Sequence, residues 1–326
     1  MARVLLTGAT GFIGQYVLRA LIDSDHEVMT PARNARFITD NFTNPNVTAV
    51  EGNFYDPALV ERFVDWRPDV IVHLAAIRGD GNGPWKHYQT VNVTGTDRLV
   101  DVALKSGSRQ FIYCSSVGVY GTVPSRLPAD PYTSAEADGF YHKSKLMAEK
   151  VVRTRLRGEL PFVIMRPTIA YGFGDDGFLV KLIHMVRRHV FPLMRKDLHI
   201  HLLDVFTCGD FVVKAIETEI DDYAIVNLAD REPVRLADLV DTVHRHFFDR
   251  RYPVLLRSPR FVHRLSEWGT GLMGMRGPHI SVKLISNDWY YDTSNLENIF
   301  QLPLKNTLDG VDYYLKHSFP RNGTHD

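Results

Sequence analysis

Tyr141 and Lys145 stand four residues apart in a stretch rich in strong helix formers. Residues at this spacing share one face of a helix, so the phenol and the ammonium group can point into one cleft. A free tyrosine has a pKa of about 10 and exchanges protons poorly at neutral pH. Because a nearby cation favours the phenolate, we expect Lys145 to lower the pKa of Tyr141 and make it a general acid or base.

Ser116 supplies a second polar group for the same chemistry. It follows the apolar run 110–114, which is typical of a buried strand. A hydroxyl at the carboxyl end of a parallel strand faces the ligand crevice, where it can hydrogen-bond the reacting oxygen beside Tyr141. Taken singly, Ser116 could instead cap a turn, and Tyr141 and Lys145 could be a surface pair.

A glycine-rich turn begins at residue 8, directly after the first strand-like run. Gly8, Gly11 and Gly14 give the spacing G-x-x-G-x-x-G, which differs from the common G-x-G-x-x-G dinucleotide fingerprint. A phosphate needs close backbone approach and free N–H groups at a helix N-terminus, and glycine provides the room. The turn therefore predicts a dinucleotide site; a tight turn without a ligand is the alternative.

The end of the second strand bears on the choice of cofactor. NAD-type sites usually carry a carboxylate there for the ribose hydroxyls, but this chain has Arg33, with Arg36 behind it. A guanidinium pairs well with a 2′-phosphate. The sequence therefore favours NADP(H), with NAD(H) possible, unless Arg33 is simply a solvated loop residue.

Apolar strand-like runs alternate with helical segments through the first half. The expected strands are residues 3–7, 27–30, 47–51, 70–74, 110–114 and 161–166, and the expected helices are 12–23, 57–66, 90–106 and 140–156. This alternation predicts an α/β fold with a doubly wound parallel sheet and right-handed crossovers.

The alternation of strand-like and helical segments becomes less regular past residue 170. Expected helices are 178–188, 210–219, 236–248 and 308–317, and 223–228 is a further strand. We expect a dinucleotide-binding domain over 1–168 with returning segments about 203–228, and a smaller interleaved C-terminal substrate-binding domain over 169–202 and 229–320. A helical stripe through Phe261, Leu265, Trp268 and Leu272, with Met273 and Met275, is interpreted as core, or else as a hydrophobic wall over the substrate.

Taken together, these segments resemble the extended short-chain dehydrogenase/reductase family, also called the NAD-dependent epimerase/dehydratase family. The resemblance rests on residues 7–14, 73–76, 92–96, 115–121 and 141–145, on Arg166-Pro167 with Tyr171-Gly172, and on Asp210. It implies a Rossmann fold, a homodimer formed through the helix 140–156, and Ser116, Tyr141 and Lys145 as the catalytic residues.

The resemblance also implies a set of cofactor-binding residues. Besides Tyr141 and Lys145, these are Gly8, Thr10, Gly11, Phe12, Ile13 and Gly14 at the pyrophosphate, Asn53 and Phe54 near the adenosine, Leu74, Ala75 and Ala76 along the cofactor, Asn92 in support, and Pro167 and Thr168 near the nicotinamide. Arg33, selected from its place at the end of the second strand, completes the set. Lys145 would also bond the nicotinamide ribose.

Departures from the family pattern bear on the substrate. Val117-Gly118 replaces the Asp-Glu pair of the sugar dehydratases, so dehydration is not expected. Ile169 and Leu203 stand where the epimerases carry an Asn and an Arg for a nucleotide diphosphate; Arg195, Lys196 or His201 could substitute. We therefore expect a reductase or dehydrogenase acting on a carbinol or ketone carbon. The alternatives are a nucleotide-sugar epimerase that retains its cofactor, and a non-catalytic dinucleotide-binding module.

Composition excludes other classes of function. Lys+Arg and Asp+Glu are both 38, so the formal net charge is zero, which disfavours a nucleic-acid or polybasic membrane binder. Two cysteines and the lack of a long apolar run favour a cytoplasmic protein with a small-molecule substrate. His199 and His201 lack a third ligand at a convincing spacing, so no metal is expected. Asp175 and Asp176 are expected to cap the helix at 178, and Cys114 to be buried.

Overall fold

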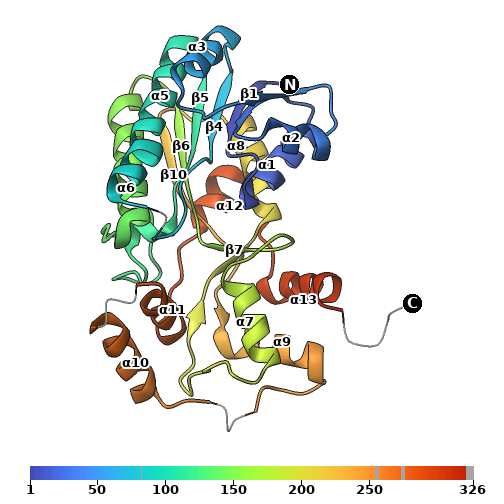
Figure 1. The fold of residues 1–326 in the computed structure, drawn as a ribbon, viewed down its shortest axis with the longest axis vertical. Helices are drawn as coiled ribbons and strands as arrows, with labels where there is room; N and C mark the ends of the chain where they lie inside the picture. Colours follow the sequence, from blue (N-terminus) through green and yellow to red (C-terminus); the bar gives the residue numbers. More distant parts are fainter. Residues whose placement is uncertain (82, 254–256, 273–275, 321–326) are drawn as a thin grey trace.

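A seven-stranded parallel sheet forms the upper part of the molecule in the computed structural model, which describes residues 1–81, 83–253, 257–272 and 276–320 (Figure 1). Its order is β3-β2-β1-β4-β5-β6-β10, which confirms the predicted fold class. The strands are β1 (Arg3–Thr7), β2 (Glu27–Ala32), β3 (Val47–Glu51), β4 (Val70–His73), β5 (Gln110–Cys114), β6 (Phe162–Pro167) and β10 (Tyr223–Leu228).

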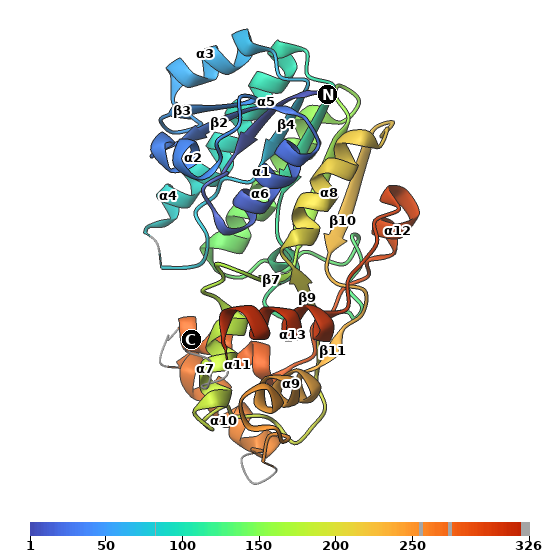
Figure 2. The same cartoon turned by 90° about the vertical axis from the view of Figure 1, so that its right-hand side faces the viewer.

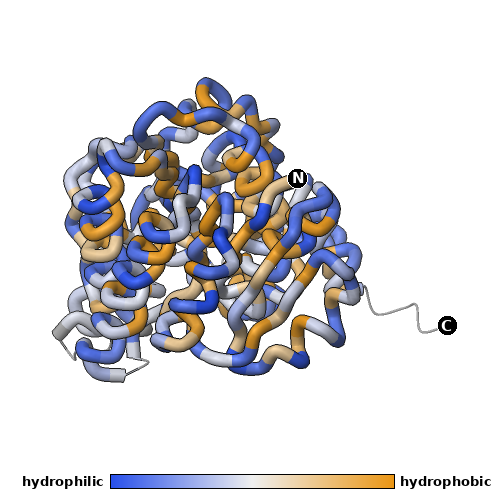
Figure 3. The backbone as a smooth tube through the Cα atoms, turned by 90° about the horizontal axis from the view of Figure 1, so that it is seen from above, coloured by the Kyte–Doolittle hydropathy of each residue, from blue (hydrophilic) through white to orange (hydrophobic). Residues whose placement is uncertain are grey.

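Two layers of helices bury the two faces of this sheet, as the apolar strand runs require. Helices α1 (Phe12–Asp23), α2 (Ala35–Asn41), α8 (Phe206–Glu217) and α12 (Ser294–Phe300) cover one face. Helices α3 (Pro57–Trp66), α5 (Gly95–Ser106) and α6 (Gly139–Leu156) cover the other. Seen from above in Figure 3, hydrophobic and hydrophilic residues alternate along the helices, as expected where only one side of each helix is buried.

The predicted helix 90–106 is two elements in the structure. A π-helical segment, η1 (Gln89–Thr94), follows the short α4 (Trp85–Tyr88) and leads directly into α5. Helix α8 begins at Phe206, four residues before the predicted start at Asp210. A 3-10 turn, η2 (Val117–Tyr120), follows β5 and starts directly after Ser116.

The second half of the chain builds a smaller unit below the carboxyl ends of the strands (Figures 1 and 2). It holds the pairs β7 (Ile169–Tyr171) with β9 (Leu202–Asp204) and β8 (His199–Ile200) with β11 (Val234–Arg235). Its helices are α7 (Phe178–Arg187), α9 (Leu236–Phe248), α10 (Arg260–Leu272), α11 (Arg276–Ser286) and α13 (Thr307–Ser318). None of the described helices is long and apolar enough to cross a membrane.

The interpretation of the stripe on α10 as core is wrong where its side chains are described. Leu265 is 64% exposed and Trp268 is 67% exposed. Met273 and Met275 lie outside the described residues. Helical spacing identified an apolar face but gave no information on whether another element covers it.

Candidate functional site

A cleft of about 720 Å³ runs along the carboxyl ends of β1, β4, β5 and β6, between the sheet and the smaller unit. This is where open parallel sheets bind their ligands. The residues that sequence reasoning placed at a site and that line this cleft are Gly8, Gly11, Phe12, Ile13, Gly14, Leu74, Ala76, Ser116, Tyr141, Lys145, Pro167 and Thr168. The structure thus gathers five separate segments into one cavity.

The glycine turn has the shape that a pyrophosphate needs. Gly8 has a φ of +84°, and a Cβ at Gly14 would lie 1.9 Å from the carbonyl oxygen of Gly8. Gly11 is the N-cap residue of α1, and no side chain caps this helix. Because the first N–H groups of α1 therefore remain available beside the cleft, the chain fits a dinucleotide phosphate here.

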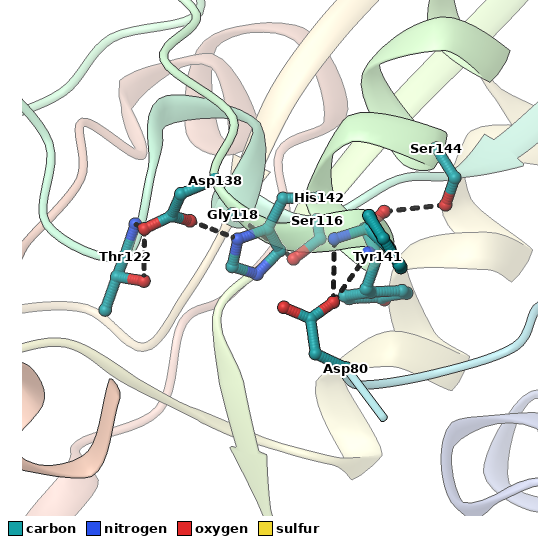
Figure 4. Close-up of polar contacts among 9 residues, drawn as sticks. Asp80, Ser116, Gly118, Thr122, Asp138, Tyr141, His142 and Ser144 are labelled. Carbon is teal, nitrogen blue, oxygen red and sulfur yellow. Dashed lines mark hydrogen bonds and ion pairs between the residues drawn. The ribbon is translucent and has the colours of Figure 1, made fainter. Parts of the chain in front are cut away.

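Tyr141 lies in the first turn of α6, where Asp80 fixes the backbone. Asp80 Oδ1 accepts hydrogen bonds from the N–H groups of Phe140 (2.8 Å) and Tyr141 (2.9 Å) (Figure 4). Ser116 lies beside Tyr141 in the lining of the cleft, where its hydroxyl acts to lower the pKa of the phenol, and its Oγ accepts a bond from the N–H of Gly118 at 3.1 Å. Hydroxyl and phenol from two different elements thus meet in the cleft, which is the arrangement that an acid and its hydrogen-bonding partner require.

The charge state of the site differs from the sequence-based expectation. Burial raises the pKa of Tyr141, with a smaller contribution in the same direction from Cys114, whereas Arg78 and the bond from Ser116 act to lower it. The Lys145 ammonium donates to the carbonyl oxygen of Cys114 at 2.7 Å, and burial lowers its own pKa. The phenol is therefore held in its protonated form, contrary to the lowering expected from Lys145.

Asn92 lies one layer behind Tyr141 and is buried. Its side chain accepts a bond from the N–H of Ile77 (2.8 Å) and donates to Ser144 Oγ (2.8 Å). Ser144 in turn donates to the carbonyl oxygen of Tyr141 at 2.7 Å. Asn92 comes from the π-helical η1, and such segments often occur at functional sites. It links the segment after β4 to the helix that carries Tyr141.

Besides Asn92, five predicted cofactor residues are outside the described lining of the cleft. Thr10 and Arg33 are exposed, and Asn53 and Ala75 are partly buried. Phe54 is buried and packs against His73. Arg33 therefore stands at the surface just after β2, where the structure gives it no contact with the cleft.

The structure also brings in residues that the sequence analysis did not select. Arg78, Asp80, Thr122 and His142 line the cleft beside the predicted residues. His142 lies inside the segment 141–145, and the signal for the other three was closeness in sequence to the segments 73–76 and 115–121. The far wall is apolar and comes from distant segments, with Phe178, Ile280, Leu284, Trp289 and Tyr291.

The five residues that the sequence analysis considered for binding a nucleotide diphosphate lie in different places relative to the cleft. Ile169 lines the cleft, whereas Leu203 is buried in the core beside α1 and α8. Arg195, Lys196 and His201 lie outside the described lining. Lys196 is 3.5 Å from Asp288, and Arg195 contacts a backbone carbonyl at 3.4 Å.

Three further expectations concern individual side chains. His201 is buried against the carbonyl oxygen of Asp230, whereas His199 is 3.6 Å from Asp288, so the two rings have different partners. Asp175 Oδ1 accepts a bond from the N–H of Gly177, the N-cap residue of α7, and Asp176 pairs with Arg78 at 2.9 Å. Cys114 is buried as expected, and burial raises its pKa to about 11.

Comparisons with known proteins agree with this geometry. The profile of the NAD dependent epimerase/dehydratase family matches residues 4–212. An N-acetyl-alpha-D-glucosaminyl-diphospho-ditrans,octacis-undecaprenol 4-epimerase of Escherichia coli is 26% identical over 250 residues, 74% of this chain and 71% of that protein. A UDP-glucose 4-epimerase of Vibrio cholerae is 29% identical over 57% of each chain.

The chain is also similar to a steroid-related enzyme in sequence and to an NAD+-bound enzyme in structure. A 3 beta-hydroxysteroid dehydrogenase/Delta 5-->4-isomerase of Mycobacterium tuberculosis is 30% identical over 57% of this chain and 52% of that protein. The crystal structure of the Bordetella bronchiseptica enzyme WbmH in complex with NAD+ has the same fold, with a TM-score of 0.74, 21% identity, and coverage of 98% of this chain and 99% of that chain. With the family profile matched over 209 of 326 residues (4–212), the chain belongs to the NAD dependent epimerase/dehydratase family of enzymes.

Proposed function

We propose that this protein is a sugar epimerase that keeps a nicotinamide dinucleotide in the glycine-lined end of the cleft and acts at a carbinol carbon of a diphosphate-linked sugar. The observation that carries the proposal is the pairing of Ser116 with Tyr141 in the same cavity as the glycine turn. Two relatives are named as sugar 4-epimerases, and this favours an epimerase over the reductase that the sequence alone had suggested.

The chain's own residues divide the work as follows. Gly8, Gly11 and Gly14 would hold the pyrophosphate, and Lys145 would orient the nicotinamide ribose. A bound oxidised dinucleotide supplies the hydride acceptor. Ser116 would hydrogen-bond the reacting oxygen, and Tyr141 would take the proton of the substrate hydroxyl as the hydride leaves the same carbon.

The bound dinucleotide would also supply the hydride for the opposite face, and Tyr141 would return its proton to the oxygen, so that an alcohol of inverted configuration results. The substrate is then neither oxidised nor reduced overall. The raised pKa of Tyr141 suits the second step, in which a protonated phenol donates to a carbonyl oxygen. The first step requires a phenolate, which a neighbouring cation would favour, and Lys145 is the residue that we propose for this role.

A reductase or dehydrogenase is the second candidate, and the composition of the cleft favours it. Ile169 stands where epimerases carry a diphosphate-binding Asn, and the far wall has apolar Phe178, Ile280, Leu284 and Trp289. A relative that is 30% identical is named as a hydroxysteroid dehydrogenase. A non-catalytic dinucleotide-binding module is the remaining alternative, although such a module has no need of Ser116, Tyr141 and Lys145 together.

The test measures conversion of UDP-glucose, UDP-galactose and UDP-N-acetylglucosamine without added cofactor, next to NADH and NADPH consumption with a panel of ketones. The epimerase proposal expects sugar conversion and a dinucleotide released on denaturation. Stoichiometric consumption of reduced cofactor by ketones, without sugar conversion, would identify a reductase. A bound dinucleotide with no turnover would identify the module.

Replacing Tyr141 with Phe removes the proton-carrying oxygen and leaves the ring. We expect turnover to fall at least a hundredfold, because acid–base catalysis contributes about 10²–10⁴-fold. Dinucleotide affinity, measured by fluorescence titration, should stay within about threefold. Substantial activity in this variant would contradict the assignment of Tyr141.

The preference between cofactors is a separate question. The proposal of NADP(H) rests on Arg33 alone, whereas the family name and the NAD+ complex of the similar structure favour NAD(H). Titration of the cofactor-free protein with NADH and NADPH decides it, and a tenfold tighter binding of NADH would remove the role given to Arg33. Replacement of Arg33 with Ser should weaken only NADPH if that role is correct.

A further inference from the structure

His142 follows Tyr141 on α6 and lines the cleft, yet the proposed chemistry does not use it. Its Nδ1 lies 2.7 Å from Asp138 Oδ1, and its side chain is 20% exposed. The other carboxylate oxygen of Asp138 accepts two bonds from Thr122, from the hydroxyl at 2.7 Å and from the N–H at 3.2 Å. Figure 4 shows the imidazole between Asp138 and Ser116, at the end of this hydrogen-bonded chain.

The Asp138 carboxylate fixes which nitrogen of His142 carries a hydrogen. Burial acts to raise the pKa of Asp138, but the hydrogen bonds from His142 and Thr122 outweigh it and hold the pKa below its usual range. An ionised carboxylate only accepts hydrogen bonds, so Nδ1 is the donor. In the neutral imidazole Nε2 is then an acceptor, and it points away from Asp138 (Figure 4).

Gly118 is the reason that the ring can occupy this position. A Cβ at residue 118 would lie 2.1 Å from Cδ2 and 2.2 Å from Nε2 of His142. The N–H of the same glycine donates to Ser116 Oγ. The His142 imidazole on α6 therefore covers Gly118 and lies beside the Ser116 hydroxyl, which we expect to bond the reacting oxygen.

We propose that His142 is a specificity-determining residue whose Nε2 accepts a hydrogen bond from a substrate hydroxyl next to the reacting carbon. The cleft would then select substrates with two neighbouring oxygens, such as a sugar ring or an α-hydroxyketone, over a simple ketone or alcohol. Asp138 is the positioning residue that orients the ring. The inference rests on the proposed hydride chemistry at a carbinol or ketone carbon, and the alternative is a ring that only fills space over Gly118.

Two substitutions separate hydrogen bonding from space filling. His142→Gln keeps a polar group near the position of Nε2, whereas His142→Phe keeps the ring without its nitrogens. The measurement is the ratio of kcat/KM for 2-hydroxycyclohexanone to kcat/KM for cyclohexanone, with NADH, and in parallel the rate of UDP-glucose conversion. We expect the ratio to fall about tenfold in His142→Phe and to stay within about threefold in His142→Gln.

A double-mutant cycle with Gly118, which contacts the His142 ring, tests the same role of His142. Gly118→Ala must displace the ring, so we expect it to lower the ratio in the wild-type background and to add nothing once His142 is replaced by Ala. An unchanged ratio in His142→Phe, or an equal fall in the Phe and Gln variants, overturns the proposal.

Failure of the proposed function is visible separately, as wild-type protein that turns over neither ketone nor UDP-glucose. In that case the role of His142 is tested by calorimetric titration of the NAD-loaded protein with UDP-glucose, which measures the binding affinity. Binding weakened about tenfold in His142→Phe and kept in His142→Gln supports the role of His142. Equal affinity of the wild type and both variants, or no binding to any of them, overturns it.

Discussion

His201 ties the strand pairs of the smaller unit to the loop after β10, and it is 1% exposed. Its Nε2 lies 2.8 Å from the carbonyl oxygen of Asp230, and its Nδ1 lies 3.3 Å from the N–H of Tyr291. Burial lowers its pKa to about 4, although both backbone contacts act in the other direction. The unfolded chain takes up a proton near pH 6.5 and the folded chain only near pH 4, so this histidine costs stability as the pH falls through that window.

Replacing His201 with Gln should remove this cost. The free energy of unfolding of the wild type, relative to the variant, is expected to fall by up to about 1.4 kcal/mol per pH unit below pH 6.5. Urea unfolding at pH 7, 6 and 5 measures it. The comparison must be a difference, because burial raises the pKa of Asp230 to about 6, and that group acts with the opposite sign in the same window. A difference that does not change with pH would contradict the prediction.

At the scale of elements, the start of α6 determines where Tyr141 stands. Gly139 has a φ of +70°, and a Cβ there would lie 1.9 Å from Asp80 Oδ2, while the other oxygen of Asp80 holds the N–H groups of Phe140 and Tyr141. Gly158, just beyond the other end of the helix, has a φ of +76° and no atom within 4 Å of such a Cβ. The two glycines therefore both have a positive φ, but only at Gly139 would a Cβ collide with Asp80.

Gly139→Ala and Gly158→Ala form a matched pair. Both should lose about 1 kcal/mol of stability, because an L-residue is strained at positive φ. Only Gly139→Ala should also push Asp80 away from the helix and lower kcat, by about tenfold or more. Chemical unfolding and steady-state rates measured on both variants check this. Equal rates in the two variants would show that the contact with Asp80 does not position Tyr141.

The elements that the sequence predicts well are those whose pattern is local. Strands buried on both faces are near-continuous apolar runs between turns, and β1, β3, β5 and β10 have the expected bounds. Which element packs against the apolar face of a helix, by contrast, does not depend on a local pattern. Helices α10 and α11 are both amphipathic, yet Leu265 and Trp268 of α10 are exposed whereas Ile280 and Leu284 of α11 line the cleft.

At the scale of the whole molecule, the cleft is predictable on one side only. The glycine turn and the Tyr141–Lys145 pair are recognisable within short stretches of sequence, so the side of the cleft that we propose for the cofactor could be predicted. The substrate side combines Thr122, His142, Phe178 and Trp289 from four separate segments. It becomes visible only once the chain is folded, because none of these residues has a partner at a diagnostic spacing.

The last prediction concerns self-association, for which the family resemblance implies a dimer through α6. Met147 on α6 is 39% exposed and Leu104 on the adjacent α5 is 38% exposed, so these contacting helices offer apolar atoms to solvent. In a two-fold interface one substitution acts twice, so Met147→Lys should split a dimer into single chains. Val190→Lys, at a 60% exposed residue of the smaller unit, is the matched control and should not change the mass. Analytical ultracentrifugation measures the outcome, and a wild type that sediments as one chain would refute the dimer.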